Sequence, residues 1–468
     1  MYKTDTIVAC ATPPGRGGVA IVRLSGPEAR DIGQRLFKPG QPGPLKAWGL
    51  RHGHALDPGR QESIDEALAV LMPAPHSYTG EDTVEIHCHG SPLVVERIVA
   101  AAVSVGARVA ERGEFSRRAV LNGRMDLLQA EAVLDLINAP VEAGVRQAWQ
   151  QLQGALSQRL QLIRGSLVAE LAEVEANVDF SDEELPEENS SLRMERLETA
   201  TTGLQALLDG FAASRRSREG LRTVFCGRPN VGKSSLINAL LGQGRMIVSD
   251  EPGTTRDAVE ETVDLGGQAF VLTDTAGVRE TSSKAEGLAV ATARQRMLEA
   301  DIAVVVIDGS LPLGGQDRQL LAAFGPDGGS AGAVKPAVVV VVNKIDLPDG
   351  LSGTEHNYLN SLDFSLISTS ALDPDGCHSL AQALLLLARE RGPEEGQQVG
   401  ISRLRHREAI ARACDRLRAT IALVVDGGGT ELVAMELRAS VDELASITEP
   451  LDNEEVLDRI FGEFCIGK

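Results

Sequence analysis

Residues 227–234 read GRPNVGKS, and this stretch decides which fold the middle of the chain adopts. It matches the pattern G-x-x-x-x-G-K-[ST], in which the glycines let backbone N–H groups approach phosphates. The lysine adds a positive charge near the phosphates, and the final hydroxyl binds Mg²⁺. A β-rich run at 222–226 precedes the motif and a helical stretch at 235–241 follows it. The stretch therefore predicts a phosphate-binding loop between a strand and a helix.

Further segments in the same part of the chain extend this site. They read GTTRD at 253–257, DTAG at 274–277, NKID at 343–346 and SA at 370–371. Threonine and aspartate in such loops help to hold Mg²⁺ and the γ-phosphate. The Asp346 carboxylate can accept two N–H bonds from guanine, whereas adenine would leave it unpaired. Almost continuously apolar runs lie between the segments, which is typical of parallel strands covered on both faces. The pattern predicts a doubly wound α/β GTPase domain of the Ras-like type.

The predicted nucleotide ligands all lie in or beside these segments. They are Asn230, Val231, Gly232, Lys233, Ser234, Ser235, Ser249, Asp250, Glu251, Pro252, Gly253, Thr254, Thr255, Asp274, Thr275, Ala276, Gly277, Asn343, Lys344, Asp346, Ser370, Ala371 and Leu372. Ser234 and Thr255 are the predicted Mg²⁺ ligands. Val278 stands where Ras-like enzymes use a glutamine to orient water, so another group must assist hydrolysis.

The composition restricts the possible functions of the chain. It has 468 residues with 46 Lys and Arg against 66 Asp and Glu, a net charge of −20. This acidic balance argues against a protein that coats nucleic acid. Aromatic residues are 3% of the chain, which disfavours base-stacking platforms. No two of the six cysteines have Cys-x-x-Cys spacing, and no apolar run is long enough to cross a bilayer, so we expect a soluble cytoplasmic protein.

The pattern of apolar residues divides the chain into four segments. Residues 1–120 mix strand and helix patterns and predict an α+β domain. Residues 121–216 and 392–468 share a helical pattern, and residues 217–391 between them carry the GTPase motifs. We therefore predict one discontinuous helical domain into which the GTPase domain is inserted, because domains with close termini tolerate such insertion.

Segments outside the GTPase motifs resemble the MnmE (TrmE) family of GTPases, which modify the wobble uridine of certain tRNAs. The resemblance extends over the whole chain. Its segments are TPPGRGGVAIVRLSG at 12–26, YTGEDTVEIHCHG at 78–90, GEFSRRAVLNGRMDL at 113–127, NVDFSDEE at 177–184 and CIGK at 465–468.

The resemblance implies roles for residues far from the GTPase motifs. The N-terminal domain would dimerise and bind a reduced folate, 5,10-methylenetetrahydrofolate or a 5-formyl analogue, through Arg23, Glu85, Arg124 and Lys468. Cys465 would have a further role at that site. A homodimer would join an FAD-dependent MnmG partner in a heterotetramer. Together they would build a carboxymethylaminomethyl or aminomethyl group on C5 of the uridine.

The resemblance also implies how hydrolysis proceeds without a glutamine after Gly277. Glu286 would be the catalytic acid/base. A bound K⁺ would supply the charge that an arginine finger gives elsewhere. Its implied ligands are Asn230, Ser249, Glu251 and Thr254.

Two other functions compete with this interpretation. A ribosome-assembly GTPase would need an RNA-binding module such as a KH domain, and the chain contains no GXXG loop in a basic setting. A non-catalytic nucleotide switch would not need Lys233, Ser234, Asp274 and Glu286 together. The tRNA-binding surface, the nitrogen donor and the tRNAs recognised stay open. The arginines at 215, 216, 218, 403, 405 and 407 are candidates for tRNA contact, although we favour solvated helix faces.

Overall fold

The computed structural model describes residues 5–179, 190–247, 260–274, 300–325, 336–391, 400–449 and 454–468. The chain forms two compact units. The first comprises Met1–Leu134, Gln151–Thr201 and Ala409–Lys468, and the second comprises Asp135–Gln150 and Thr202–Glu408. Among the described residues, no helix combines the length and the apolar character needed to cross a membrane.

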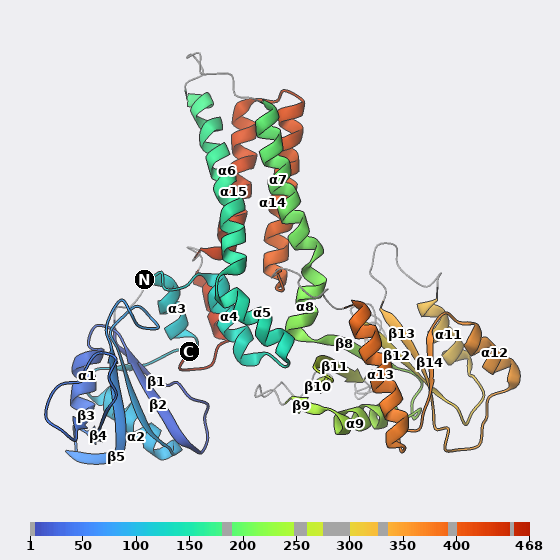
Figure 1. Cartoon of the computed structure of the whole chain (residues 1–468), viewed down its shortest axis with the longest axis horizontal. Coiled ribbons are helices and arrows are strands. Elements are labelled where there is room, and N and C mark those ends of the chain that lie inside the picture. The colour runs from blue at the N-terminus through green and yellow to red at the C-terminus, as the bar shows by residue number, and fades with distance from the viewer. Residues whose placement is uncertain are drawn as a thin grey trace, which may run out of the picture. The chain divides into compact units, whose positions relative to one another are not determined.

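The first unit begins with a seven-stranded sheet in the order β3-β4-β5-β6-β2-β1-β7 (Figure 1). Its neighbouring strands are antiparallel except for the parallel pair β1 and β7. The elements are β1 (Ile7–Cys10), β2 (Gly17–Ser25), α1 (Ala29–Leu36), β3 (Phe37–Pro39), β4 (Arg51–Asp57), β5 (Glu62–Met72), β6 (Thr83–Gly90), α2 (Pro92–Ser104) and β7 (Arg108–Val109).

The two faces of this sheet carry different side chains. On β2 and β6, alternate residues such as Val22, Leu24 and Ile86 are buried in one apolar core with residues of α1 and α2. Because side chains alternate along a strand, Arg23 and Glu85 point to the opposite face. The register sets these two residues directly opposite each other on adjacent strands. The strand pairing thus creates a charged pair outside the core.

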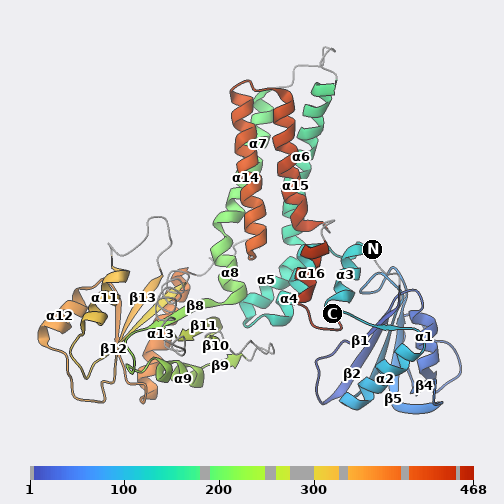
Figure 2. The ribbon, with the colours of Figure 1, turned by 180° about the vertical axis from the view of Figure 1, so that it is seen from behind.

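Helices from distant parts of the chain lie side by side in the first unit (Figure 2). Helix α6 (Ala155–Asp179) packs along α15 (Thr430–Thr448), and its apolar residues Leu156, Leu160, Leu167 and Val174, spaced three or four apart or at multiples of this, are buried. Ion pairs connect α6 to α7 (Ser190–Asp209) and α14 (Leu404–Val425) to α15. The predicted discontinuous helical domain is therefore confirmed.

Short helices connect this bundle to the N-terminal sheet within the first unit. They are α3 (Glu114–Leu121), the first part of α4 (Leu127–Asn138) and α16 (Glu454–Gly462). Val120, Leu127, Leu457, Phe461 and Phe464 form a small apolar core among them. The residues after α16 thereby lie close to α3.

The second unit contains a seven-stranded sheet in the order β14-β13-β12-β8-β11-β10-β9. The five strands from β14 to β11 run parallel, and β10 and β9 are antiparallel at one edge. The strands are β8 (Leu221–Cys226), β9 (Arg245–Ile247), β10 (Glu260–Leu265), β11 (Gln268–Asp274), β12 (Ile302–Asp308), β13 (Ala337–Asn343) and β14 (Ser365–Ser368). The helices are α5 (Glu142–Leu152), α8 (Phe211–Glu219), α9 (Lys233–Gln243), α11 (Gly315–Phe324), α12 (Gly353–Ser361) and α13 (Pro374–Arg391).

Both faces of this second sheet are covered, which explains its apolar strands. Val304 and Val306 of β12 share a core with α9 and α13, whereas Val305 and Ile307 share one with α11 and α12. The predicted doubly wound fold is therefore confirmed.

Two groups of strands were not predicted from the sequence. Strands β3 and β7 are only three and two residues long. In β4, the sequence pattern of a strand is interrupted by Gly53 between two histidines. Strand β10 is polar at most positions and only partly buried, and β9 is three residues long, so neither has the apolar run of the central strands. The finer domain boundaries at residues 120, 216 and 391 stay predictions.

Candidate functional site

The phosphate-binding loop lies between β8 and α9, as predicted. Its backbone has positive φ angles at Gly227 (151°), Asn230 (63°) and Gly232 (98°). A Cβ atom at Gly227 would lie 2.3 Å from the Val306 carbonyl oxygen, and one at Gly232 would lie 2.2 Å from Asn343 Nδ2. Both glycines are therefore required by close packing against the ends of β12 and β13.

The two charged and polar residues that end the motif lie at the N-terminus of α9. Lys233 is buried, and its Nζ donates to the carbonyl oxygens of Gly227 at 3.1 Å and Arg228 at 2.9 Å. The Ser234 hydroxyl donates to Asp274 Oδ2 at 2.5 Å. A hydroxyl and a carboxylate that meet at one point fit Mg²⁺, which takes oxygen ligands and completes its shell with water.

The predicted guanine-binding residues converge at the ends of β13 and β14. Asn343 Nδ2 donates to the Val231 carbonyl at 2.8 Å, and its Oδ1 accepts from the Ala371 amide at 3.0 Å. Asn343 thus ties the phosphate-binding loop to the segment after β14. The Ser370 hydroxyl donates to Asp346 Oδ1 at 2.5 Å. Three separate motifs of the sequence therefore form one continuous site.

Two supporting ion pairs at this site were missed by sequence reasoning. Lys344 Nζ lies 2.6 Å from Asp308 Oδ2 at the end of β12. Burial alone would raise the pKa of Asp308, but hydrogen bonds from Lys344 and Ser310 outweigh it and lower this pKa. Arg228 pairs with the buried Asp317 of α11, with Nε 2.9 Å from Oδ1. Neither aspartate belongs to a nucleotide motif. The only signal in the sequence was that each lies near the end of a strand or helix.

The other predicted nucleotide ligands are either placed beside this site or lie outside the described residues. Ser235 lies in the first turn of α9, and Leu372 is exposed next to Ala371. The remaining predicted ligands and the catalytic candidate lie outside the described residues. These are Ser249, Asp250, Glu251, Pro252, Gly253, Thr254, Thr255, Thr275, Ala276, Gly277 and Glu286.

A second cluster lies in the first unit, on the face of the N-terminal sheet opposite its core. Arg23 Nε donates to Glu85 Oε1 at 2.8 Å, and Glu85 Oε2 lies 3.2 Å from His87 Nε2. Burial would raise the pKa of Glu85, but His87 and Arg23 together lower it below its ordinary value. Glu85 is therefore held as an anion between two nitrogen partners.

The CIGK segment reaches this cluster from the other end of the chain. The amide of Gly113 donates to the Cys465 carbonyl at 3.4 Å, and the amide of Phe115 donates to Lys468 O at 3.2 Å. Burial and the nearby charge of Arg23 lower the pKa of Lys468, whereas Glu85 opposes this shift. Arg23, Glu85 and Lys468 thus lie close enough to influence one another.

Glycine is essential at one position of this segment. Gly467 has a φ of 98°, and a Cβ atom there would lie 2.0 Å from the Cys10 carbonyl oxygen. The segment therefore packs tightly against the end of β1. Cys465 itself is exposed.

The fourth predicted folate residue, Arg124, follows α3 and donates from Nε to the Ser77 carbonyl at 3.1 Å. Tyr78 follows Ser77 in the chain, and the centroid of its ring lies 5.4 Å from Cζ of Arg23. The centroid of the Phe115 ring lies 5.7 Å from the same atom. Both aromatic residues belong to segments that carried the family resemblance, but nothing in the sequence connected either ring to Arg23.

Four of the six arginines suggested for tRNA contact do not lie on solvated helix faces. Arg215 donates from one nitrogen to both oxygens of Asp301 at 3.0 and 3.1 Å, and Arg216 lies 3.7 Å from the same carboxylate. Arg403 pairs with Asp135 at 2.7 Å, and Arg218 lies 3.7 Å from it. The solvated-face interpretation is therefore wrong for these four arginines, because Asp301, which is buried, and Asp135, which is largely shielded from solvent, neutralise them from other segments.

The fold and the nucleotide site together define a class of protein. A doubly wound sheet whose GKS loop, Ser234–Asp274 pair and NKID segment meet at the carboxyl ends of its strands is a P-loop GTP-binding protein.

Comparison with known proteins identifies the family within this class. The family described as GTP-binding protein TrmE N-terminus matches residues 6–124, and the MnmE helical domain family matches residues 127–465. The tRNA modification GTPase MnmE of Heliobacterium modesticaldum is 41% identical over 474 residues and covers 99% of each chain. That of Geobacter sulfurreducens is 40% identical over 470 residues and covers 100% of each. The chain belongs to the MnmE family of tRNA modification GTPases.

Proposed function

We propose that this tRNA modification GTPase adds a carboxymethylaminomethyl or aminomethyl group to C5 of the wobble uridine. It does so in the cytoplasm, as a homodimer that forms a heterotetramer with an FAD-dependent MnmG-like partner. When bound, a reduced folate supplies the one-carbon unit. The observation that supports this proposal is the proximity of Arg23, Glu85 and Lys468, which come from opposite ends of the chain.

The folate assignment is chemically consistent with these side chains. Glu85 is ionised and can accept hydrogen bonds from the N–H groups of a pterin. Arg23, Arg124 and Lys468 can bind carbonyl oxygens or the anionic glutamyl tail. We assign Cys465 to the same site because it begins the segment that ends in Lys468. The Gly113 amide donates to the Cys465 carbonyl, and the Phe115 amide donates to Lys468 O.

For the nucleotide, we propose that Lys233 binds the β- and γ-phosphates and that Asp346 reads the guanine edge. Ser234 and Thr255 would hold Mg²⁺. The contact between Ser234 and Asp274 supports this, because a coordinating hydroxyl and a carboxylate already lie together.

We further propose that hydrolysis depends on K⁺ held by Asn230, Ser249, Glu251 and Thr254, with Glu286 as catalytic acid/base. The left-handed backbone of Asn230 in the phosphate-binding loop supports a special role for that residue. Val278 cannot orient water, so the reaction needs charge and proton transfer from other groups.

The experiment that tests the folate proposal uses the full chain and its Arg23→Ala variant. Calorimetry with 5-formyltetrahydrofolate should show binding to the wild type and weakened binding to the variant. Mass analysis of wobble uridines should show that the variant does not support modification, while its GTP hydrolysis stays unchanged. Equal folate affinity of the two chains would refute the assignment of Arg23.

The K⁺ proposal is tested by turnover in KCl and NaCl at equal ionic strength. Hydrolysis should be fast in K⁺ and slow in Na⁺, because a fixed ring of oxygens selects by cavity size and ligand number. Asn230→Ala should remove the preference, and Glu286→Ala should lower turnover by about 10²-fold while GTP still binds. Equal wild-type rates in both salts would contradict the proposal.

A further inference from the structure

Arg23 is held on several sides before any ligand arrives. Its Nε bonds to Glu85, and its guanidinium lies over the rings of Tyr78 and Phe115 with Cζ 5.4 and 5.7 Å from their centroids. The side chain is only 16% exposed. Among the described residues, no acceptor bonds to its two terminal nitrogens. These nitrogens are the ones that remain to bind an oxygen of a ligand.

The segment that carries Tyr78 is fastened along its length to helix α3 and to the residues just after it. The Tyr78 hydroxyl lies 2.8 Å from the Ser116 hydroxyl of α3. Other contacts to the same segment are Asn122 Nδ2 to the Thr79 carbonyl at 2.7 Å, Arg124 Nε to the Ser77 carbonyl at 3.1 Å, and Arg118 to the Glu81 carboxylate at 3.2 Å.

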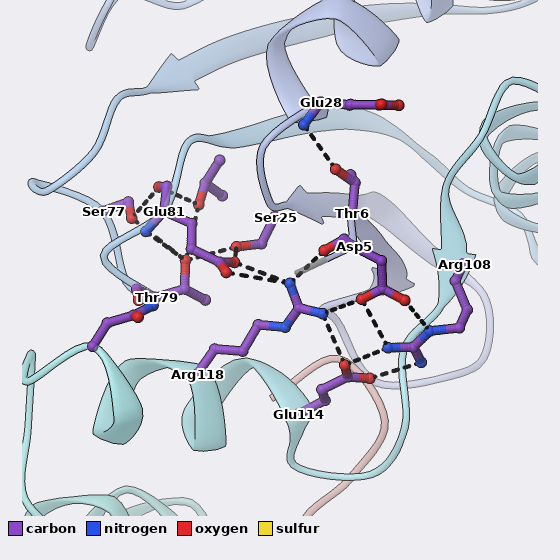
Figure 3. Close-up of polar contacts among 12 residues, drawn as sticks. Asp5, Thr6, Ser25, Glu28, Ser77, Thr79, Glu81, Arg108, Glu114 and Arg118 are labelled. Atoms are coloured by element: carbon purple, nitrogen blue, oxygen red, sulfur yellow. Dashed lines mark hydrogen bonds and ion pairs between the residues drawn. The ribbon is translucent and has the colours of Figure 1, made fainter. Parts of the chain in front are cut away.

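A cluster of charges that is buried at Arg118 and partly exposed at Asp5 and Arg108 lies among these contacts (Figure 3). Arg118 is fully buried, and its guanidinium bonds to Asp5, Glu81 and Glu114. Arg108 also pairs with Asp5 and Glu114. Two arginines and three carboxylates thus join the start of the chain, the 77–81 segment and α3. The position of Tyr78 is therefore set by several charge-assisted bonds rather than by its own contacts alone.

We propose that Tyr78 is a positioning residue of the folate site: its ring, fixed by α3, orients Arg23 for the ligand. This inference rests on the proposed folate function. A guanidinium held against aromatic faces keeps its charge but loses rotational freedom, so less order must be gained when the ligand binds. The phenol acts here as a ring and not as a base, because burial raises the pKa of Tyr78.

The test measures binding of 5-formyltetrahydrofolate to the full chain by calorimetry. Tyr78→Leu removes the aromatic face and should weaken binding about tenfold, the size of a partly desolvated cation–π contact. Tyr78→Phe keeps the face and should bind within about threefold of the wild type. The matched control is Tyr358→Leu, which removes a similar contact with Arg318 at 5.3 Å in the second unit and should leave folate binding unchanged.

A double-mutant cycle distinguishes positioning from a general structural effect. In an Arg23→Met background, Tyr78→Leu should cause little further loss, because its effect passes through Arg23. Additive losses, or wild-type affinity of Tyr78→Leu, would overturn the inference while the folate function stands. Failure of the wild type to bind folate would overturn both. If Tyr78→Leu does not fold, Tyr78→Met, which is long and apolar but has no aromatic face, replaces it in the cycle.

Discussion

The nucleotide site and the proposed folate site are built from different kinds of contact. The nucleotide site uses an eight-residue loop and the ends of neighbouring parallel strands, and several of its bonds involve backbone groups such as the Val231 carbonyl and the Ala371 amide. The proposed folate site uses side chains of Arg23, Glu85 and Lys468, which lie on two strands of the N-terminal sheet and at the last residue of the sequence. One site is encoded locally, whereas the other depends on tertiary structure.

This difference has consequences for mutations. At the nucleotide site, the sheet and its two helix layers form the scaffold, so a side chain proposed to contact guanine can be changed without loss of the fold. At the proposed folate site, the segments that carry the side chains are joined by the ion pairs of the buried Arg118. We therefore expect the largest effects on stability in the N-terminal domain.

Arg118→Met should give the largest effect. It removes a fully buried guanidinium that pairs with Asp5, Glu81 and Glu114, while Arg108 keeps its pairs with Asp5 and Glu114. Removing one partner of a buried ion pair typically costs about 3–5 kcal/mol. Hydrogen exchange of the α3 amides in the full chain reports the free energy of local opening. This free energy should fall by that amount, so the amides should exchange faster.

The control for this variant is Arg60→Met. Arg60 is 72% exposed and lies 3.8 Å from Asp57, so its loss should change local opening by less than about 0.5 kcal/mol. Similar values for the two variants would mean that the ion pairs of Arg118 do not stabilise α3, and the contrast between the two sites would lose its basis.

Asp346→Asn should give the next largest effect, on binding rather than stability. The variant replaces a charged double acceptor with a mixed donor and acceptor, so GTP affinity should fall by about 2–4 kcal/mol. Xanthosine triphosphate should bind the variant better than GTP does. Asp349→Asn is the matched control, because Asp349 is 63% exposed and bonds to His356. A similar loss of GTP affinity in both variants would refute the guanine role of Asp346.

Much of the nucleotide site was predictable because its information is local. The glycines of the loop are required by positive φ angles and close approaches, and the apolar runs of β12 and β13 follow from burial on both faces. Asp308 and Asp317 were missed, because an aspartate at a strand end or in a helix looks the same with or without a partner.

The cluster of Arg23, Glu85 and Lys468 could be singled out in the sequence only through family resemblance. Alternation shows that Arg23 and Glu85 avoid the core, but it does not reveal the strand register that sets them opposite each other. The same limit explains the incorrect interpretation of Arg215 and Arg403. A run of arginines has one appearance in the sequence, whether water surrounds it or Asp301 and Asp135 neutralise it.

Acid should weaken α3 through Asp5. Hydrogen bonds from Arg108 and Arg118 lower the pKa of Asp5 from 3.8 to about 2. A lowered pKa stabilises the folded state above pH 4, and this contribution is lost as the pH falls toward 2. Because Asp5 is 34% exposed, solvent screening limits the loss to about 1 kcal/mol. Hydrogen exchange of the α3 amides, corrected for intrinsic rates, should show this loss of stability at low pH. Asp5→Asn should make the free energy of opening less dependent on pH. The same slope in both chains would assign the effect to other carboxylates.

Arg124→Lys should give the smallest effect and should separate charge from geometry at the folate site. The change keeps the positive charge and loses the bond from Nε to the Ser77 carbonyl, so affinity for 5-formyltetrahydrofolate should change by less than about 1 kcal/mol. Arg112→Lys is the control, since Arg112 is exposed and donates to the Gly462 carbonyl at 3.4 Å. Loss of more than 1.4 kcal/mol, about tenfold, in Arg124→Lys alone would mean that the planar guanidinium itself contacts the ligand. The folate site would then depend on side-chain geometry as strictly as the nucleotide loop depends on its backbone.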